Sequence, residues 1–168
     1  WARALASLWL LALAWTTQLS NPRNGKTFRL IRSLKAAMRY ILDTNAWLRW
    51  FHRPEEISPA TREILNASPV VGLSPMSIVE VAQKTHKGKL ILPLPVDAWV
   101  RQSLPADRVK LIPISVNVAL AAYAWPMDFQ GDPADRIIAA TARIHRLTLV
   151  TSDEKLLDRA DLQTLSTR

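Results

Sequence analysis

Acidic side chains in four separate segments of the sequence could together hold a divalent metal ion. They are Asp43, Glu80, the pair Asp132 and Asp135, and Asp153. Carboxylates brought within a few ångströms of one another repel, and burial raises their pKa values, so a bound cation is the simplest way to stabilise such a cluster. The hard cations Mg²⁺ and Mn²⁺ prefer oxygen ligands of this kind. These four or five acids therefore predict a site for Mg²⁺ or Mn²⁺.

Hydrolysis of a phosphodiester bond is the chemistry that such a site would support. A divalent cation neutralises charge on the phosphate and on the leaving oxygen, and a water on the cation ionises more readily. No histidine is required for this chemistry, and the chain has only three, without a close pair. The chain has no cysteine, which excludes disulfides, thiolate metal sites and cysteine nucleophiles.

Other polar residues stand close in sequence to these acids. Asp132 and Asp135 are three residues apart on one face of a predicted helix, so both are candidate ligands of the ion. Asn45 and Ser152 are candidates for hydrogen bonds to a ligating carboxylate or to a phosphate. The hydroxyls of Thr44 and Thr151 are explained more simply as helix caps.

Each acid also has a purely structural interpretation. The aspartates precede or begin predicted helices, where Asp is a favoured N-cap. Glu80 could pair with Lys84, four residues later, on a solvated helix face. The neighbours Val79 and Val81 indicate instead a mostly buried helix, in which an unpaired carboxylate is unfavourable. The combination of all the acids, rather than any single one, favours a functional site.

Alternating strands and helices must position these residues. The predicted strands cover residues 40–42, 69–73, 109–112, 147–150 and 162–165, and the predicted helices cover 44–51, 58–66, 76–84, 96–104, 116–124, 133–145 and 153–159. Such alternation implies right-handed crossovers, and hence a three-layer α/β/α sandwich around a central, mainly parallel sheet of four to five strands. Ligands bind beyond the carboxyl ends of such strands, where Asp43 and Asp153 stand.

The positive charge of the chain is concentrated near its N-terminus. The 168 residues carry a formal net charge of +8. Residues 1–39 hold seven basic residues and no acid, whereas residues 40–168 hold 15 basic and 14 acidic residues. The body of the chain is therefore nearly neutral, and its charge gives no strong footprint for nucleic acid.

The N-terminal segment differs from the rest of the sequence. Residues 4–15 form an almost unbroken apolar run, shorter than the roughly 20 residues that span a bilayer. The run resembles the core of a signal peptide, and a turn-rich linker follows at 20–26. We expect residues 1–37 to form an extension outside the fold, either an upstream start of translation or a real anchor. Residues 38–168 are expected to form one domain, without membrane contact unless the apolar run is such an anchor.

Four sequence motifs occur in order along this domain. They are Tyr-Ile-Leu-Asp-Thr-Asn at 40–45, Ser-Ile-Val-Glu at 77–80, Gly-Asp-Pro-Ala-Asp-Arg-Ile-Ile-Ala-Ala-Thr-Ala at 131–142 and Leu-Thr-Leu-Val-Thr-Ser-Asp at 147–153. Together they resemble the PIN-domain family, and most closely its VapC-type toxins of bacterial toxin–antitoxin pairs. The resemblance extends from about residue 38 to about residue 165.

The resemblance implies a PIN-like fold and a Mg²⁺- or Mn²⁺-dependent endoribonuclease that cleaves RNA as the toxin of a pair. It also implies inhibition by a cognate antitoxin protein and a homodimeric assembly. The family's acidic positions fall on Asp43, Glu80, Asp135 and Asp153, and Asp132 belongs to a variant of the third motif. Such an enzyme meets its substrate and its antitoxin in the cytoplasm, which is therefore the expected location.

Two other functional classes remain open at this point. A catalytically silent PIN-like binding module would act through an antitoxin or a DNA-bound complex, but it has no need for a full set of repelling carboxylates. A metal-dependent phosphatase of the aspartyl-phosphate kind would carry a second aspartate two residues after Asp43, where this chain has Asn45.

Overall fold

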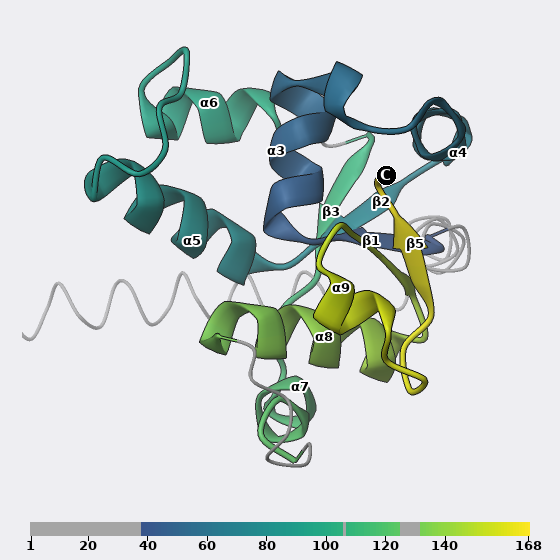
Figure 1. Cartoon of the computed structure of the whole chain (residues 1–168). Coiled ribbons are helices and arrows are strands. Elements are labelled where there is room, and N and C mark those ends of the chain that lie inside the picture. Colours follow the sequence, from purple (N-terminus) through teal and green to yellow (C-terminus); the bar gives the residue numbers. More distant parts are fainter. Residues whose placement is uncertain (1–37, 106, 125–131) are drawn as a thin grey trace, which may run out of the picture. The chain divides into compact units, whose positions relative to one another are not determined.

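The computed structural model describes residues 38–105, 107–124 and 132–168 of the chain (Figure 1). The extension predicted at residues 1–37, with its apolar run at 4–15, lies outside the described residues. In the described part of the chain, no helix has the length and apolar character needed to cross a membrane.

Five parallel strands form one sheet at the centre of the fold. The strands are β1 (Tyr40–Leu42), β2 (Val71–Leu73), β3 (Val109–Leu111), β4 (Thr148–Thr151) and β5 (Thr164–Ser166). Their order across the sheet is β3–β2–β1–β4–β5, so β1 lies in the middle. The predicted parallel sheet is confirmed, and the last predicted strand is its edge strand next to β4.

Helices connect each strand to the next. They are α3 (Thr44–His52), the short 3₁₀ helix η1 (Pro54–Glu56) and α4 (Pro59–Ala67) between β1 and β2, α5 (Pro75–His86) and α6 (Val96–Gln102) between β2 and β3, α7 (Val116–Ala121) and α8 (Pro133–His145) between β3 and β4, and α9 (Glu154–Leu157) between β4 and β5. All the predicted helices among the described residues are present, whereas η1 was not predicted.

Short polar caps determine where two of these helices begin. Ser58 and Ser74 accept hydrogen bonds from the backbone N–H groups of Thr61 and Met76, over 3.4 and 3.3 Å. A proline follows each serine, and its fixed φ angle and missing N–H suit the first turn of a helix. The Ser-Pro pairs in the sequence are therefore the local cause of α4 and α5.

The two C-terminal helices differ in how well the sequence predicted their ends. α8 begins and ends at the predicted residues, and the chain leaves it through Arg146 in the left-handed conformation (φ 54°). α9 covers residues 154–157 rather than 153–159. It is shorter because Asp153 is its N-cap and the chain turns at Asp158, which lets β5 pair with β4.

The helices cover the sheet on both faces, because successive strand residues point to opposite sides. Ile41 and Leu149 pack against α7, α8 and α9, whereas their neighbours Leu42 and Val150 pack against α3, α5 and α6. Figure 1 shows α7 and α8 on one side of the sheet and α3 and α6 on the other. These two buried layers confirm the predicted three-layer sandwich.

The order of the strands reverses direction at the centre of the sheet. From β1 the chain crosses to β2 on one side, whereas β4 pairs with β1 on the other side. The loops that follow β1 and β4 therefore separate in opposite directions, and ligands of open α/β sheets bind at this kind of switch point. The backbone N–H of Asp43 donates to the carbonyl of Val150 over 3.0 Å and joins the two loops at their start.

Gly72 in β2 is closely surrounded by its neighbours. A Cβ atom there would lie 2.7 Å from Cδ1 of Ile112, 3.2 Å from Sδ of Met38 and 3.3 Å from the backbone oxygen of Tyr40. We expect Gly72→Ala to lower the free energy of unfolding by about 1–3 kcal/mol, because the buried Ile112 side chain must shift to make room. Urea denaturation measures this change. Lys89→Ala, at an exposed site, is the control, and an unchanged stability for Gly72→Ala would contradict the packing described here.

Candidate metal centre

Asp43 is the buried acid at the carboxyl end of β1. Its carboxylate accepts the N–H of Ala46 over 2.5 Å, so the residue is the N-cap of α3. Burial raises the pKa of Asp43 above its usual value. A hydrogen bond from the Thr151 side chain and the charge of Arg49 act in the opposite direction but do not cancel the effect of burial. Asp43 is therefore both a capping residue and a buried carboxylate whose ionised form is disfavoured.

Glu80 reaches the same region from the middle of α5. Its Oε2 accepts a hydrogen bond from the Thr44 hydroxyl over 2.6 Å, and its Oε1 lies 2.6 Å from Nζ of Lys84. The predicted alternative of a pair with Lys84 is therefore present. The prediction of a mostly buried helix is wrong at Val79, which is 55% exposed. The shielding of Glu80, whose side chain is only 12% exposed, comes from Thr44 and Lys84 instead.

Asp132 and Asp135 begin α8 in different ways. Asp132 is the N-cap, and its Oδ1 accepts the N–H groups of Ala134 and Asp135 over 2.8 and 2.9 Å. Asp135 lies in the first turn and is half-buried. Burial, followed by the negative charges of Asp132, Glu80, Asp153 and Asp43, raises the pKa of Asp135 to about 7. The other four predicted acids are therefore close enough to Asp135 to act on its carboxyl group electrostatically.

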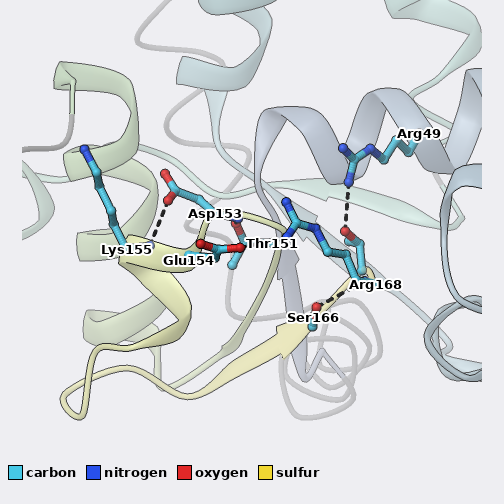
Figure 2. Close-up of polar contacts among 8 residues, drawn as sticks. Arg49, Thr151, Asp153, Glu154, Lys155, Ser166 and Arg168 are labelled. Carbon is cyan, nitrogen blue, oxygen red and sulfur yellow. Dashed lines mark hydrogen bonds and ion pairs between the residues drawn. The ribbon is translucent and has the colours of Figure 1, made fainter.

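Asp153 follows β4 and is the N-cap of α9. Its Oδ1 accepts the N–H of Lys155 over 2.9 Å, and its own N–H donates to the Thr151 hydroxyl over 3.0 Å. Figure 2 shows Thr151 and Asp153 together at this turn. Asp153 thus has the structural role of an N-cap, as its place before a predicted helix indicated.

The segment after β5 is fastened close to this turn. Nη1 of Arg49 donates to the Thr167 hydroxyl over 3.0 Å, and Arg168 forms an ion pair with Glu154 at 2.8 Å. The side chains of Arg49 and Arg168 are drawn in the same close-up as Asp153 (Figure 2). The charge of Arg49 thus reaches Asp43 from a side chain that is held in place by the end of the sheet.

Two hydroxyls that the sequence assigned to caps have a different role. The Thr44 hydroxyl donates to Glu80, and the Thr151 side chain bonds to Asp43. Neither contact has a local signal, because Thr44 and Glu80 are 36 residues apart and meet only through the packing of α3 on α5. Asn45 is exposed and Ser152 is half-buried, and neither side chain contacts a carboxylate within the described residues. Their predicted role stays a prediction.

The donor set of this cluster fits a hard divalent cation. Every candidate ligand is a carboxylate oxygen, and burial together with the charges of four neighbouring acids raises the pKa of Asp135. Among the residues described, no three His, Asp or Glu side chains converge closely enough to hold an ion as they stand. The caps of α8 and α9 engage Asp132 and Asp153, and Lys84 contacts Glu80.

A central parallel sheet with an acidic cluster beyond β1 and β4 defines a PIN domain. Residues 40–162 match the model of the PIN domain, and the chain belongs to this family. Ribonuclease VapC22 of Mycobacterium tuberculosis is 34% identical to the chain over 116 residues, which are 69% of this chain and 88% of that protein. The predicted family is therefore confirmed.

Solved structures share the fold at lower sequence identity. VapBC2 from Rickettsia felis, bound to a DNA fragment from its promoter, matches with a TM-score of 0.60 and 17% identity over 78% of this chain and 99% of that chain. DNA-bound VapBC from Salmonella typhimurium matches with a TM-score of 0.57 and 19% identity over the same shares, 78% and 99%. These likenesses confirm the predicted α/β/α fold.

The charge around Asp135 predicts a pH dependence of stability. The raised pKa means that the folded chain binds more protons than the unfolded chain between the ordinary Asp value of 3.8 and about 7. In EDTA, the free energy of unfolding should therefore fall as the pH rises through this range. Asp135→Asn removes the effect, so the variant should be more stable than the wild type by about 1–2 kcal/mol at pH 8, after allowance for partial exposure, and equally stable at pH 4.

Urea denaturation at pH 4, 6 and 8 measures this difference. Asp97→Asn, at an exposed position on α6, is the matched control and should follow the wild type at every pH. An Asp135→Asn variant that is less stable than the wild type at pH 8 in EDTA would contradict the described environment of Asp135.

Proposed function

We propose that this chain is a Mg²⁺- or Mn²⁺-dependent endoribonuclease that hydrolyses RNA phosphodiester bonds and acts as the toxin of a toxin–antitoxin pair. The observation that carries the proposal is the environment of Asp135, whose pKa is raised first by burial and then by the charges of Asp132, Glu80, Asp153 and Asp43. The likeness to a relative named as a ribonuclease supports the same chemistry and substrate class.

Four acids are proposed to hold the ion. They are Asp43, Glu80, Asp135 and Asp153, each from a different element of the fold. Asp132 is assigned to the N-cap of α8, where its charge adds to the field of the site. When bound, a divalent ion would neutralise these acids and the RNA phosphate and would make a water molecule a better nucleophile.

The residues of the chain would fix the geometry of the reaction. Asp43 is immobilised by burial and by its N-cap bond to α3. Thr44, in the first turn of α3, holds Glu80 of α5 by a hydrogen bond. The water oxygen would form a bond to phosphorus while the bond from phosphorus to the 3′-oxygen breaks, and that oxygen would take up a proton. The expected products have 5′-phosphate and 3′-hydroxyl ends. Preorganised acids of this kind act mainly by positioning and by electrostatic stabilisation.

A cognate antitoxin protein is the proposed regulator of this activity. The proteins with the same fold include VapBC from Rickettsia felis and from Salmonella typhimurium, both in structures with DNA. An antitoxin would inhibit RNA cleavage by covering the carboxylates or the surface around them. Cytoplasmic location is proposed on the same basis, because the RNA substrate and the antitoxin are made there.

Loss of one metal ligand should abolish cleavage without unfolding the chain. Asp43→Asn is suitable because Asn caps a helix as well as Asp does and has the same size. We expect cleavage of total RNA in Mn²⁺ to fall by about 100-fold or more, because the ion loses its most buried ligand. Sequencing of the cleaved ends measures both the activity and the 5′-phosphate.

Two controls define what contradicts this proposal. Asp97→Asn on α6 should cleave as the wild type does, and circular dichroism should be the same for all three proteins. Full activity of Asp43→Asn, or wild-type cleavage that persists in excess EDTA, would contradict a carboxylate metal site. RNA binding by the wild type without any cleavage in Mg²⁺ or Mn²⁺ would favour the catalytically silent module.

We further propose that two copies of the chain associate through an apolar face on β3 and α7. Five large apolar side chains there are each at least 38% exposed: Leu111, Ile114, Val116, Leu120 and Tyr123. Residues 111–124 contain no charged side chain, and β3 is an edge strand. An uncharged apolar surface is complementary to a second copy of itself across a two-fold axis, which is the commonest symmetry of soluble oligomers.

A charge in the middle of this face should separate the two copies. Across a two-fold axis, Leu120→Asp buries two like charges, so we expect a monomer where the wild type is a dimer. Size-exclusion chromatography with light scattering measures the mass. Ile91→Asp, at a site that is 87% exposed and outside the face, should remain dimeric. A monomeric wild type, or a dimeric Leu120→Asp variant, would contradict the assignment of the face.

A further inference from the structure

The Glu80 carboxylate is held by two donors, one on each oxygen. The Thr44 hydroxyl donates to Oε2 and the Lys84 ammonium contacts Oε1, both over 2.6 Å. Thr44 precedes Glu80 by 36 residues and belongs to α3, whereas Lys84 lies one turn further along α5. Both oxygens of this proposed ligand are thus already engaged within the chain.

The two donors differ in how readily they can leave. Thr44 is buried, and its short, branched side chain is fixed by the backbone of α3 beside Asp43. The side chain of Lys84 is 34% exposed, and its four-carbon stem allows the ammonium to move into water without a change in the helix. Lys84 is therefore the contact that can be exchanged.

Lys84 is in direct ionic contact with one of the five acids. Its Nζ lies 2.6 Å from Oε1 of Glu80. An ordinary exposed pair four residues apart on a helix contributes only a few tenths of a kcal/mol. Here Glu80 is 12% exposed and adds to the negative field on Asp135, so the attraction for a cation is stronger than on an open helix face.

We propose that Lys84 is an exchangeable counter-cation of Glu80, which competes with the divalent ion for the same carboxylate. Thr44 is the positioning residue that holds the other oxygen. The inference rests on the proposed function, since it assigns Glu80 to the ion. Its consequence is that the chain contains an internal competitor that weakens metal binding and stabilises Glu80 until the ion is bound.

Titration of Mn²⁺ into the metal-free full-length chain, followed by isothermal calorimetry, tests this competition. Lys84→Met keeps the length of the stem and removes the charge, and we expect it to lower the Kd for Mn²⁺ about three- to tenfold. Lys87→Met removes the same charge one turn further along, where no acid within the described residues pairs with it. Its Kd should change by less than about twofold, which separates direct contact from a general change in charge.

A double-mutant cycle shows whether the effect acts through Glu80. In a Glu80→Gln background, Lys84→Met should no longer alter the affinity for Mn²⁺. Lys84→Gln provides a second neutral variant, and circular dichroism checks the folding of each protein. Conversely, a Kd that is unchanged or raised in both neutral variants would overturn the competition.

The same titrations separate this inference from the proposed function. If the wild type binds Mn²⁺ and Glu80→Gln weakens that binding, the metal site stands whatever the result for Lys84. If the wild type does not bind Mn²⁺, the proposed metal site fails and the competition fails with it.

Discussion

Repulsion between carboxylates at the carboxyl end of a parallel sheet is the constraint on which this structure depends. The strand order places the ends of β1 and β4 side by side, and α5 and α8 add Glu80 and Asp135 to the same region. Such a cluster opposes folding, because burial and like charges both disfavour ionised carboxylates. The two buried layers on either face of the sheet must therefore stabilise the fold against its own site.

Helix N-termini reduce this repulsion. Asp43, Asp132 and Asp153 are the N-caps of α3, α8 and α9, so each carboxylate accepts backbone N–H groups at the positive end of a helix. The structural and the functional interpretations of these acids are therefore compatible, because a cap bond uses one oxygen and leaves the charge in place. Asp135 has no such cap role, and burial together with the neighbouring carboxylates raises its pKa.

Local patterns predicted the elements well, because their causes are local. The Ser-Pro pairs before α4 and α5 and the aspartate before α8 are signals within a few residues of the helix start. The ends of α9 were predicted less well, since the pairing of β5 with β4 determines where that helix stops. Asp43 and Asp153 could be predicted from their places after strands, and Glu80 and Asp135 from the motifs that contain them, but the partners of these acids could not. The bond from Thr44 to Glu80 depends on how α3 packs on α5, and no local pattern reports that approach.

Asp43, Glu80, Asp135 and Asp153 are proposed to form one site for a divalent ion. A crystal of the full-length chain grown with Mn²⁺ and measured at the manganese absorption edge would show where the ion binds. We expect an anomalous difference peak enclosed by these four acids. A peak bound by other residues, or no peak at saturating Mn²⁺, would contradict this site.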